Sequence, residues 1–283
     1  MTKAFCPGHI TCFFSPVRTA DVMTTGSLGA GIRLNKGTVV TAEERGDRKI
    51  TITMDGIECD ANVTERTIKM LAPDTGFDVT IENELPVSQG MGMSAAGAVA
   101  AGLCVASTKG MNEYDAYKAA HISEVRNGGG LGDVAGILGG RCPMRIKAGI
   151  PPFGRTIDLG ADIDVSVVIL GPKMDTGSVI SDENKMKMIS AAGAECVSEL
   201  MNDMSVKRLY ELSSGFSDTI GLMTKDVEHA LSLLRKDHMA SMCMLGNSIF
   251  TNADKEHVRN VLGDVTVISC SAGSKGPEIT RKA

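Results

Sequence analysis

The segment with the clearest chemical content is a glycine-rich turn that runs into a series of small residues, PVSQGMGMSAAGA over 86–98. Gly90 and Gly92 permit backbone dihedrals and close approaches that a Cβ would forbid. The small residues from Ser94 onward predict a helix, and the first amides of a helix are unpaired donors near about half a positive charge. The pattern therefore predicts a phosphate-binding loop.

A second interpretation of the same segment stays open, because a helix that packs tightly against a sheet also needs small residues. The loop is neither a G-x-x-x-x-G-K-[ST] motif nor a G-x-G-x-x-G motif, since residue 95 is alanine. Ser94 favours the phosphate interpretation, because its hydroxyl suits a Mg²⁺ ion bound to phosphate. The segment alone does not decide between the two.

Two carboxylates fall near a second glycine cluster, NGGGLGDVAGILGG over 127–140. Asp133 lies inside that cluster and is well placed to meet a substrate hydroxyl, while Glu124 lies nine residues upstream, near the end of an expected helix. Such a pair can divide two tasks, one carboxylate holding Mg²⁺ and the other orienting or deprotonating an attacking hydroxyl. The alternatives are a turn-forming aspartate and a solvated glutamate.

The elements that must position these residues follow from hydrophobic periodicity and helix-capping signals. Alternating residues predict strands at 37–45, 49–56, 77–87, 155–160, 164–172 and 264–276. Helical patterns follow Ser94 and occupy 111–127, 181–204, about 205–214, 226–243 and 253–263. Asn112 is an expected N-cap, and the segment 147–155, with two prolines, is the expected linker between two halves of the chain.

Composition excludes several classes of function. The chain has 283 residues, 43% hydrophobic and 22% charged, with a net charge of −5, which argues against a nucleic-acid-binding surface. No apolar run approaches the roughly 20 residues of a membrane span, and we expect a cytoplasmic protein without nucleic-acid or membrane partners. The eight cysteines show no C-x-x-C spacing and the five histidines no H-x-x-x-H spacing, so we expect reduced, buried thiols.

Taken together, four motifs resemble those of the GHMP small-molecule kinases, in the same order and over essentially the whole chain. The phosphate-loop segment resembles P-x-x-x-G-L-G-S-S-A-A, with Met91 and Met93 as departures. CPGHI at 6–10 resembles the first motif, with His9 where many relatives carry lysine. The glycine cluster around Asp133 resembles the catalytic-aspartate loop. VISCSAGSKGPEI at 267–279 stands in the place of the third, more glycine-rich motif.

The resemblance implies an α+β fold in two parts, a mixed α/β ATP-binding domain over 1–150 and a ferredoxin-like domain over 151–283. It implies ATP and Mg²⁺ as cofactors, Asp133 as the catalytic residue, and Ser94 and Glu124 as metal ligands, although the spacing from Glu124 to Asp133 differs slightly from that of better-known relatives. It implies a possible homodimer. The residues expected to cradle the triphosphate are Pro86, Gly90, Met91, Gly92, Met93, Ser94, Ala95 and Ala96.

Within the superfamily, segments such as TTGSLGAGIRL and GIPPFGRTIDL most resemble archaeal pantoate kinases. That resemblance implies phosphorylation of the primary hydroxyl of pantoate, a small hydroxy acid, on the route to coenzyme A. His9 is expected near the substrate, and Arg18 and Arg155 are the candidates for its carboxylate, because a guanidinium binds carboxylate in a bidentate fork. The alternatives are a kinase for homoserine, shikimate or mevalonate, or a non-catalytic sensor on the same fold.

Overall fold

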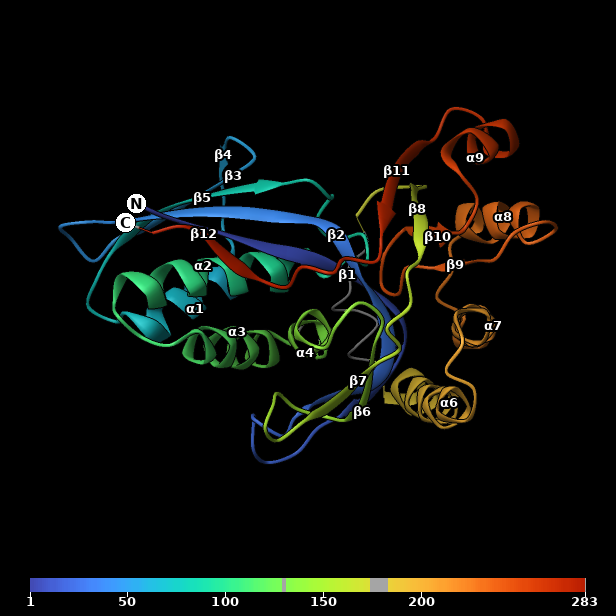
Figure 1. Cartoon of the computed structure of the whole chain (residues 1–283), viewed down its shortest axis with the longest axis horizontal. Coiled ribbons are helices and arrows are strands. Elements are labelled where there is room, and N and C mark those ends of the chain that lie inside the picture. The colour runs from blue at the N-terminus through green and yellow to red at the C-terminus, as the bar shows by residue number, and fades with distance from the viewer. Residues whose placement is uncertain (129–130, 174–182, 283) are drawn as a thin grey trace.

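The computed structural model describes residues 1–128, 131–173 and 183–282. The protein contains two β-sheets with helices packed on them (Figure 1). The first sheet has the order β12-β1-β2-β5-β3-β4, and β6 pairs with β2 and β7. Its strands are β1 Thr2–Val17, β2 Gly26–Glu44, β3 Ile50–Met54, β4 Ile57–Glu58, β5 Phe77–Asn83, β6 Pro143–Lys147, β7 Arg155–Asp158 and β12 Glu278–Arg281. The α+β class expected from the sequence is confirmed.

The second sheet is antiparallel and has the order β11-β8-β10-β9. Its strands are β8 Asp164–Ile169, β9 Ala240–Met242, β10 Ser248–Thr251 and β11 Thr266–Ser271, and its helices are α6 Glu183–Asn202, α7 Val206–Ile220, α8 Lys225–Leu234 and α9 Lys255–Leu262. In chain order, α6, α7 and α8 lie between β8 and β9, and α9 lies between β10 and β11. This is the β-α-β-β-α-β arrangement of a ferredoxin-like unit, as expected.

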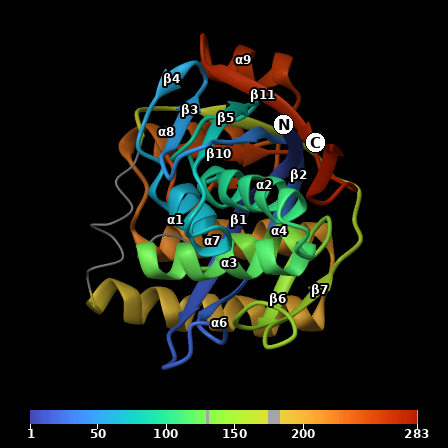
Figure 2. The same cartoon turned by 90° about the vertical axis from the view of Figure 1, so that its left-hand side faces the viewer.

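The small-residue segment forms the central helix of the first half, between the long sheet and two other helices (Figure 2). Helix α2 Met93–Thr108 packs against β1 and β2 on one side and against α1 Asn62–Leu71 and α3 Glu113–Asn127 on the other. All its residues from Ala95 to Ala106 are buried, which explains why it has almost no polar face. The close-packing interpretation therefore holds for the body of this helix.

Most of the expected elements are present, and Asn112 caps α3 as predicted, with a capping box to Asp115. The helix expected at 226–243 is wrong in its second half, because α8 ends at Leu234 and residues 240–242 pair with β10. The sequence patterns also missed β1 and α1. In β1 the alternation is broken by register shifts between Pro7 and His9 and between Thr11 and Phe13.

The two sheets do not divide the chain at a single point. The segment expected to be a linker, 147–155, instead connects β6 to β7 within the first sheet. At the other end of the chain, β12 returns to the first sheet and pairs with β1, so that the two termini lie near each other in Figure 1. The domain boundary at residue 150 stays a prediction.

Helix α4 Asp133–Leu138 lies beside β1, β2 and β6 and brings the second glycine cluster to the sheet. Residues 129 and 130 of that cluster lie outside the described part of the chain. All eight cysteines are free and all but Cys59 are buried, which confirms the expected packed thiols. Among the helices described here, none is long and apolar enough to cross a membrane.

The packing of α2 makes a paired prediction about its two interior glycines. A Cβ on Gly97 would lie 3.6 Å from Thr64 Oγ1, whereas one on Gly102 would lie 3.2 Å from Ala116 Cβ and Thr67 Cγ2. Gly97→Ala should therefore raise the free energy of unfolding by about 0.5–1 kcal/mol, the helix-propensity gain. Gly102→Leu should lower it by about 1–3 kcal/mol through overpacking. Urea unfolding of both variants measures the difference, and equal effects would contradict close packing at Gly102.

Candidate active site

A bulge in β1 joins the first motif to the phosphate loop. The register of β1 on β2 shifts between Pro7 and His9, and the His9 amide donates a hydrogen bond of 2.9 Å to the Met91 carbonyl instead of continuing the sheet ladder. Gly8 faces the same loop, since a Cβ there would lie 3.2 Å from the Met91 oxygen. The first motif therefore fixes the loop through the backbone.

The loop itself turns through positive φ angles, +75° at Gly90 and +61° at Gly92, which glycine adopts without strain. Gly92 is the N-cap of α2, and the Ala96 amide donates to its carbonyl at 2.9 Å as the first bond of that helix. The amides before Ala96 have no partner within the helix, as in any first turn, and suit an anion. Ser94 is exposed in this first turn.

Asp133 opens helix α4 and faces the start of α2. Its Oδ1 accepts hydrogen bonds from His9 Nδ1 at 3.0 Å and from Thr11 Oγ1 at 3.3 Å. Burial by itself would raise the pKa of Asp133, but the hydrogen bond from His9, the charge of Arg145 and the hydrogen bond from Thr11 together hold it below its ordinary value. Burial lowers the pKa of His9, which favours the neutral ring with its proton on Nδ1. Asp133 is therefore ionised at neutral pH.

Glu124 lies buried on α3, and its Oε2 has no hydrogen-bond partner among the residues that the structure describes. Burial raises its pKa well above the ordinary value, the negative charge of Asp133 raises it further, and the Val134 amide lowers it. A buried carboxylate oxygen without a partner is costly, and a bound cation would remove that cost. Glu124 and Ser94 border the same cavity, so these two residues fit the metal ligands expected from the sequence.

Arg145, on β6, is a site residue that the sequence patterns missed. It is 2% exposed, and within residues 1–128, 131–173 and 183–282 its Nε and Nη1 have no hydrogen-bond acceptor. Burial lowers its pKa, although the carboxylates of Asp133 and Glu124 act in the opposite direction. Gly132, the N-cap of α4, leaves room for this guanidinium, since a Cβ there would lie 2.8 Å from Arg145 Nε. A buried guanidinium that lines a cavity and has unpaired donors is suited to an anionic ligand.

These groups surround one cavity of about 270 Å³. Its lining includes the residues Gly90, Met91, Gly92, Met93, Ser94, Glu124 and Asp133, all expected from the sequence. The structure adds Thr11, Ser27, Arg145 and an apolar wall of Phe14, Pro16, Leu131 and Met186. Segments that are far apart in the chain thus bring an anion-binding loop, two carboxylates and a guanidinium together.

The other expected site residues lie elsewhere. His9 is fully buried and does not line the cavity, and it bonds to the Asp133 carboxylate through its ring and to the Met91 carbonyl through its amide. Arg18 and Arg155 are exposed and do not line the cavity. Pro86 is partly buried before the loop, Ala95 and Ala96 are buried in the first turn of α2, and none of the three lines the cavity. The described residues contain no cluster of three or more histidines, cysteines or carboxylates that would hold a metal on its own.

Comparison with known sequences supports this arrangement. A family model described as the GHMP kinases N-terminal domain matches residues 61–141. A pantoate kinase of Thermococcus kodakarensis is 33% identical over 282 residues, which is 94% of this chain and 93% of that protein. A pantoate kinase of Methanocaldococcus jannaschii is 29% identical over 259 residues, 91% and 95% of the two chains.

Solved structures agree with the fold. A protein described as a phosphotransferase related to the CoA biosynthesis pathway superposes with a TM-score of 0.89 at 31% identity, over 99% of this chain and 98% of that one. A galactokinase of Lactococcus lactis, in complex with galactose, has a TM-score of 0.72 at 14% identity, over 98% and 94% of the chains. The second similarity shows the fold alone.

The raised pKa of Glu124 makes a prediction about stability. A carboxyl whose pKa is raised by folding costs stability above its ordinary pKa of about 4.3, where the unfolded chain would ionise it freely. Glu124→Gln should therefore raise the Tm of the metal-free protein at pH 7, by about 2–4 °C for each kcal/mol recovered, and should leave it unchanged near pH 3.5. Added Mg²⁺ should stabilise the unaltered protein more than the variant. A lower Tm for the variant at pH 7 would contradict the assignment.

Proposed function

Because the chain belongs to the GHMP kinase superfamily and, within it, to the family of the archaeal pantoate kinases, we propose that it phosphorylates pantoate. The γ-phosphoryl group of ATP is transferred to the primary hydroxyl, giving 4-phosphopantoate on the way to coenzyme A. One observation carries the proposal: a single cavity brings the phosphate loop, the ionised Asp133 and the buried Arg145 together. A kinase of a small hydroxy acid needs each of these three features.

The phosphate loop would hold the triphosphate of ATP. The amides at the start of α2 lie at the positive end of a buried helix and face the cavity through Gly92 and Met93. Small residues at these positions let the phosphates approach the backbone. Positioning and neutralisation of charge supply most of the catalysis in such a reaction, because the transferring phosphoryl group needs little covalent assistance.

The residues of the site fit a Mg²⁺ ion. Glu124 offers a buried carboxylate oxygen without a partner, and Ser94 offers an exposed hydroxyl at the phosphate loop. When bound, the ion neutralises charge on the phosphates. A cation beside Glu124 would also favour its ionised form, against the burial that raises its pKa.

Asp133 would orient the primary hydroxyl and accept its proton. The carboxylate is 22% exposed, so one oxygen is free to face the cavity while Oδ1 is held by His9 and Thr11. His9 supports Asp133 from behind, and the neutral ring fixes the carboxylate without placing a second cation in the cavity. The lowered pKa keeps Asp133 ionised before the hydroxyl arrives, which suits a proton acceptor that acts late in a loose transition state.

Arg145 would bind the carboxylate of pantoate. Its guanidinium borders the cavity with two buried donors unpaired, whereas Arg18 and Arg155 are exposed away from it. The apolar wall around Phe14 and Leu131 suits the two methyl groups of pantoate. Homoserine would add an ammonium group beside this guanidinium, which the site disfavours. The homodimer and the cytoplasmic location stay predictions.

A substrate panel tests the proposal directly. ADP release from ATP and Mg²⁺ should show a higher kcat/KM for pantoate than for homoserine, shikimate or mevalonate, since a site built for one polar group rejects analogues without it by as much as about 10⁴-fold. Asp133→Asn should lower kcat with pantoate by about 10²–10⁴-fold and largely retain ATP binding. Faster turnover of another acceptor would leave a kinase with a different substrate, and acceptor binding without ADP release would indicate a sensor.

Substitution of Arg145 separates acceptor binding from nucleotide binding. Arg145→Met keeps the length of the apolar stem but removes the charge and the donors. We expect KM for pantoate to rise by about 10²-fold, the value of two charge-assisted hydrogen bonds, while KM for ATP changes little. Arg155→Met is the matched control, because that side chain is exposed and outside the cavity. A larger effect in the control would move the carboxylate site to Arg155.

A further inference from the structure

Gln89, the residue immediately before Gly90, is tied to the four-stranded sheet by every polar group of its side chain. It is 4% exposed. Its Nε2 donates to the Gly171 carbonyl at 2.9 Å, and its Oε1 accepts from the Asn247 amide at 3.0 Å. Its own backbone carbonyl accepts from Ser248 Oγ at 2.7 Å. Three hydrogen bonds thus join one loop residue to Gly171 after β8, to Asn247 just before β10 and to Ser248, the first residue of β10.

The partner of Gln89 is the turn between β9 and β10, which packs directly on the phosphate loop. A Cβ on Gly90 would lie 2.7 Å from the Cys243 carbonyl, and one on Gly246 would overlap the backbone of Gln89. Leu245 in this turn has a φ of +63°, an uncommon conformation for a non-glycine residue, and borders the cavity. The two turns interlock through their backbones, and Gln89 is the side chain that bonds them.

The hydrogen bonds of Gln89 act on residues 88–92, the turn that leads into the phosphate-binding amides of α2. Ser88, Gly90 and Gly92 all have positive φ angles, so the chain around Gln89 reverses direction within a few residues. Ser88 is not glycine, and its φ of +61° carries a cost that neighbouring contacts must offset. Gln89 lies between Ser88 and Gly90 and is held on three sides, so its hydrogen bonds are the contacts that oppose relaxation of this turn.

We propose that Gln89 is a positioning residue, which shapes the phosphate loop from the four-stranded sheet and so makes ATP binding depend on the second half of the chain. This inference rests on the proposed function, in which residues 90–94 hold the triphosphate. Gln89 does not line the cavity and acts only through the loop. The site needs a donor toward Gly171 and an acceptor toward Asn247 at the same time. Glutamine supplies both, ionised glutamate lacks the donor, and methionine lacks both.

The test compares Gln89→Met and Gln89→Glu with the unaltered protein, by calorimetric titration with ATP and Mg²⁺ and by steady-state kinetics with pantoate. Gln89→Met leaves a buried donor and acceptor unpaired, so we expect Kd and KM for ATP to rise by about tenfold or more, with KM for pantoate within about twofold. Gln89→Glu should bind ATP poorly at pH 8 and recover toward the unaltered protein near pH 5.5, because a protonated carboxyl regains the donor.

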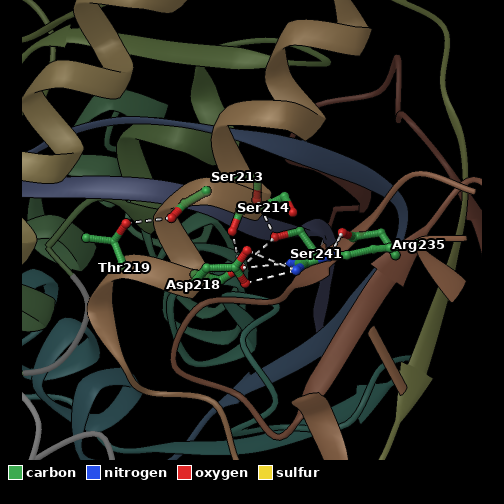
Figure 3. Close-up of polar contacts among 9 residues, drawn as sticks. Ser213, Ser214, Asp218, Thr219, Arg235 and Ser241 are labelled. Carbon is green, nitrogen blue, oxygen red and sulfur yellow. Dashed lines mark hydrogen bonds and ion pairs between the residues drawn. The ribbon is translucent and has the colours of Figure 1, made fainter. Parts of the chain in front are cut away.

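A matched control separates positioning from general loss of stability. Ser217 in α7 is also fully buried, and its hydroxyl has three polar partners, the Ser214 carbonyl, Ser241 Oγ and Arg235 Nη2. Figure 3 labels the three partner residues, Ser214, Arg235 and Ser241. This network lies in the same half of the molecule, and within the described part of the chain its hydrogen bonds do not reach the phosphate loop. Ser217→Ala should lower Tm and leave Kd for ATP unchanged.

The outcomes are distinct. If Gln89→Met loses stability as Ser217→Ala does and keeps the affinity of the unaltered protein for ATP, the inference is wrong and the proposed function stands. If the unaltered protein binds no ATP, the proposed function fails and this inference fails with it. Ser248→Ala removes the 2.7 Å bond to the Gln89 carbonyl, together with the side-chain hydrogen bond between Ser248 and Cys243, and provides a milder variant should Gln89→Met not fold. It should raise Kd for ATP in the same direction, and an unchanged Kd would count against the inference.

Discussion

The site depends on three charged groups around one small cavity, the carboxylates of Asp133 and Glu124 and the guanidinium of Arg145. These groups do not satisfy all of one another's hydrogen-bonding atoms. Charges taken out of water are expensive unless hydrogen bonds or opposite charges compensate them. Asp133 is compensated by His9 and Thr11, but Glu124 and Arg145 keep unpaired atoms. This cost in stability occurs where a cation and an anion are expected to bind. The cation would become the missing partner of Glu124, and the anion that of Arg145. Burial raises the pKa of Glu124, whereas the partners of Asp133 hold its pKa down, so the two values move apart.

Close backbone approach is the second constraint, and it accounts for most of the glycines around the site. Gly31 and Gly136 lie against the two sides of the His9 ring, where any Cβ would overlap it. Gly132 makes room for Arg145, and Gly92 brings the phosphate loop to within contact of Asp133. Small residues therefore serve two purposes in this segment. The body of α2 needs them for close packing, and its N-terminus needs them so that the phosphate loop, His9 and Asp133 can come together.

The motifs along the chain are sufficient to predict the family, the fold class and those cavity residues that belong to a recognisable motif. Glycines before a small-residue helix, a serine in its first turn and an aspartate in a glycine cluster are local features, and local physical chemistry determines what they can do. The same holds for the Asn112 cap, whose hydrogen bonds lie within four residues. None of these inferences depends on which distant segment of the chain packs beside the motif.

Only the tertiary structure decided which arginine lines the cavity and which contacts hold the phosphate loop. Arg18 and Arg155 lie in segments that look suited to binding, yet both are exposed, whereas Arg145 is one of two charged residues in the short strand β6 and is buried. Its burial follows from the pairing of β6 with β2 and from the room left by Gly132, neither of which is a property of the residues near it in the chain. Gln89 likewise bonds to residues more than eighty positions away. Local patterns encode what a residue can bind, but burial and orientation depend on long-range pairing, which the sequence patterns do not display.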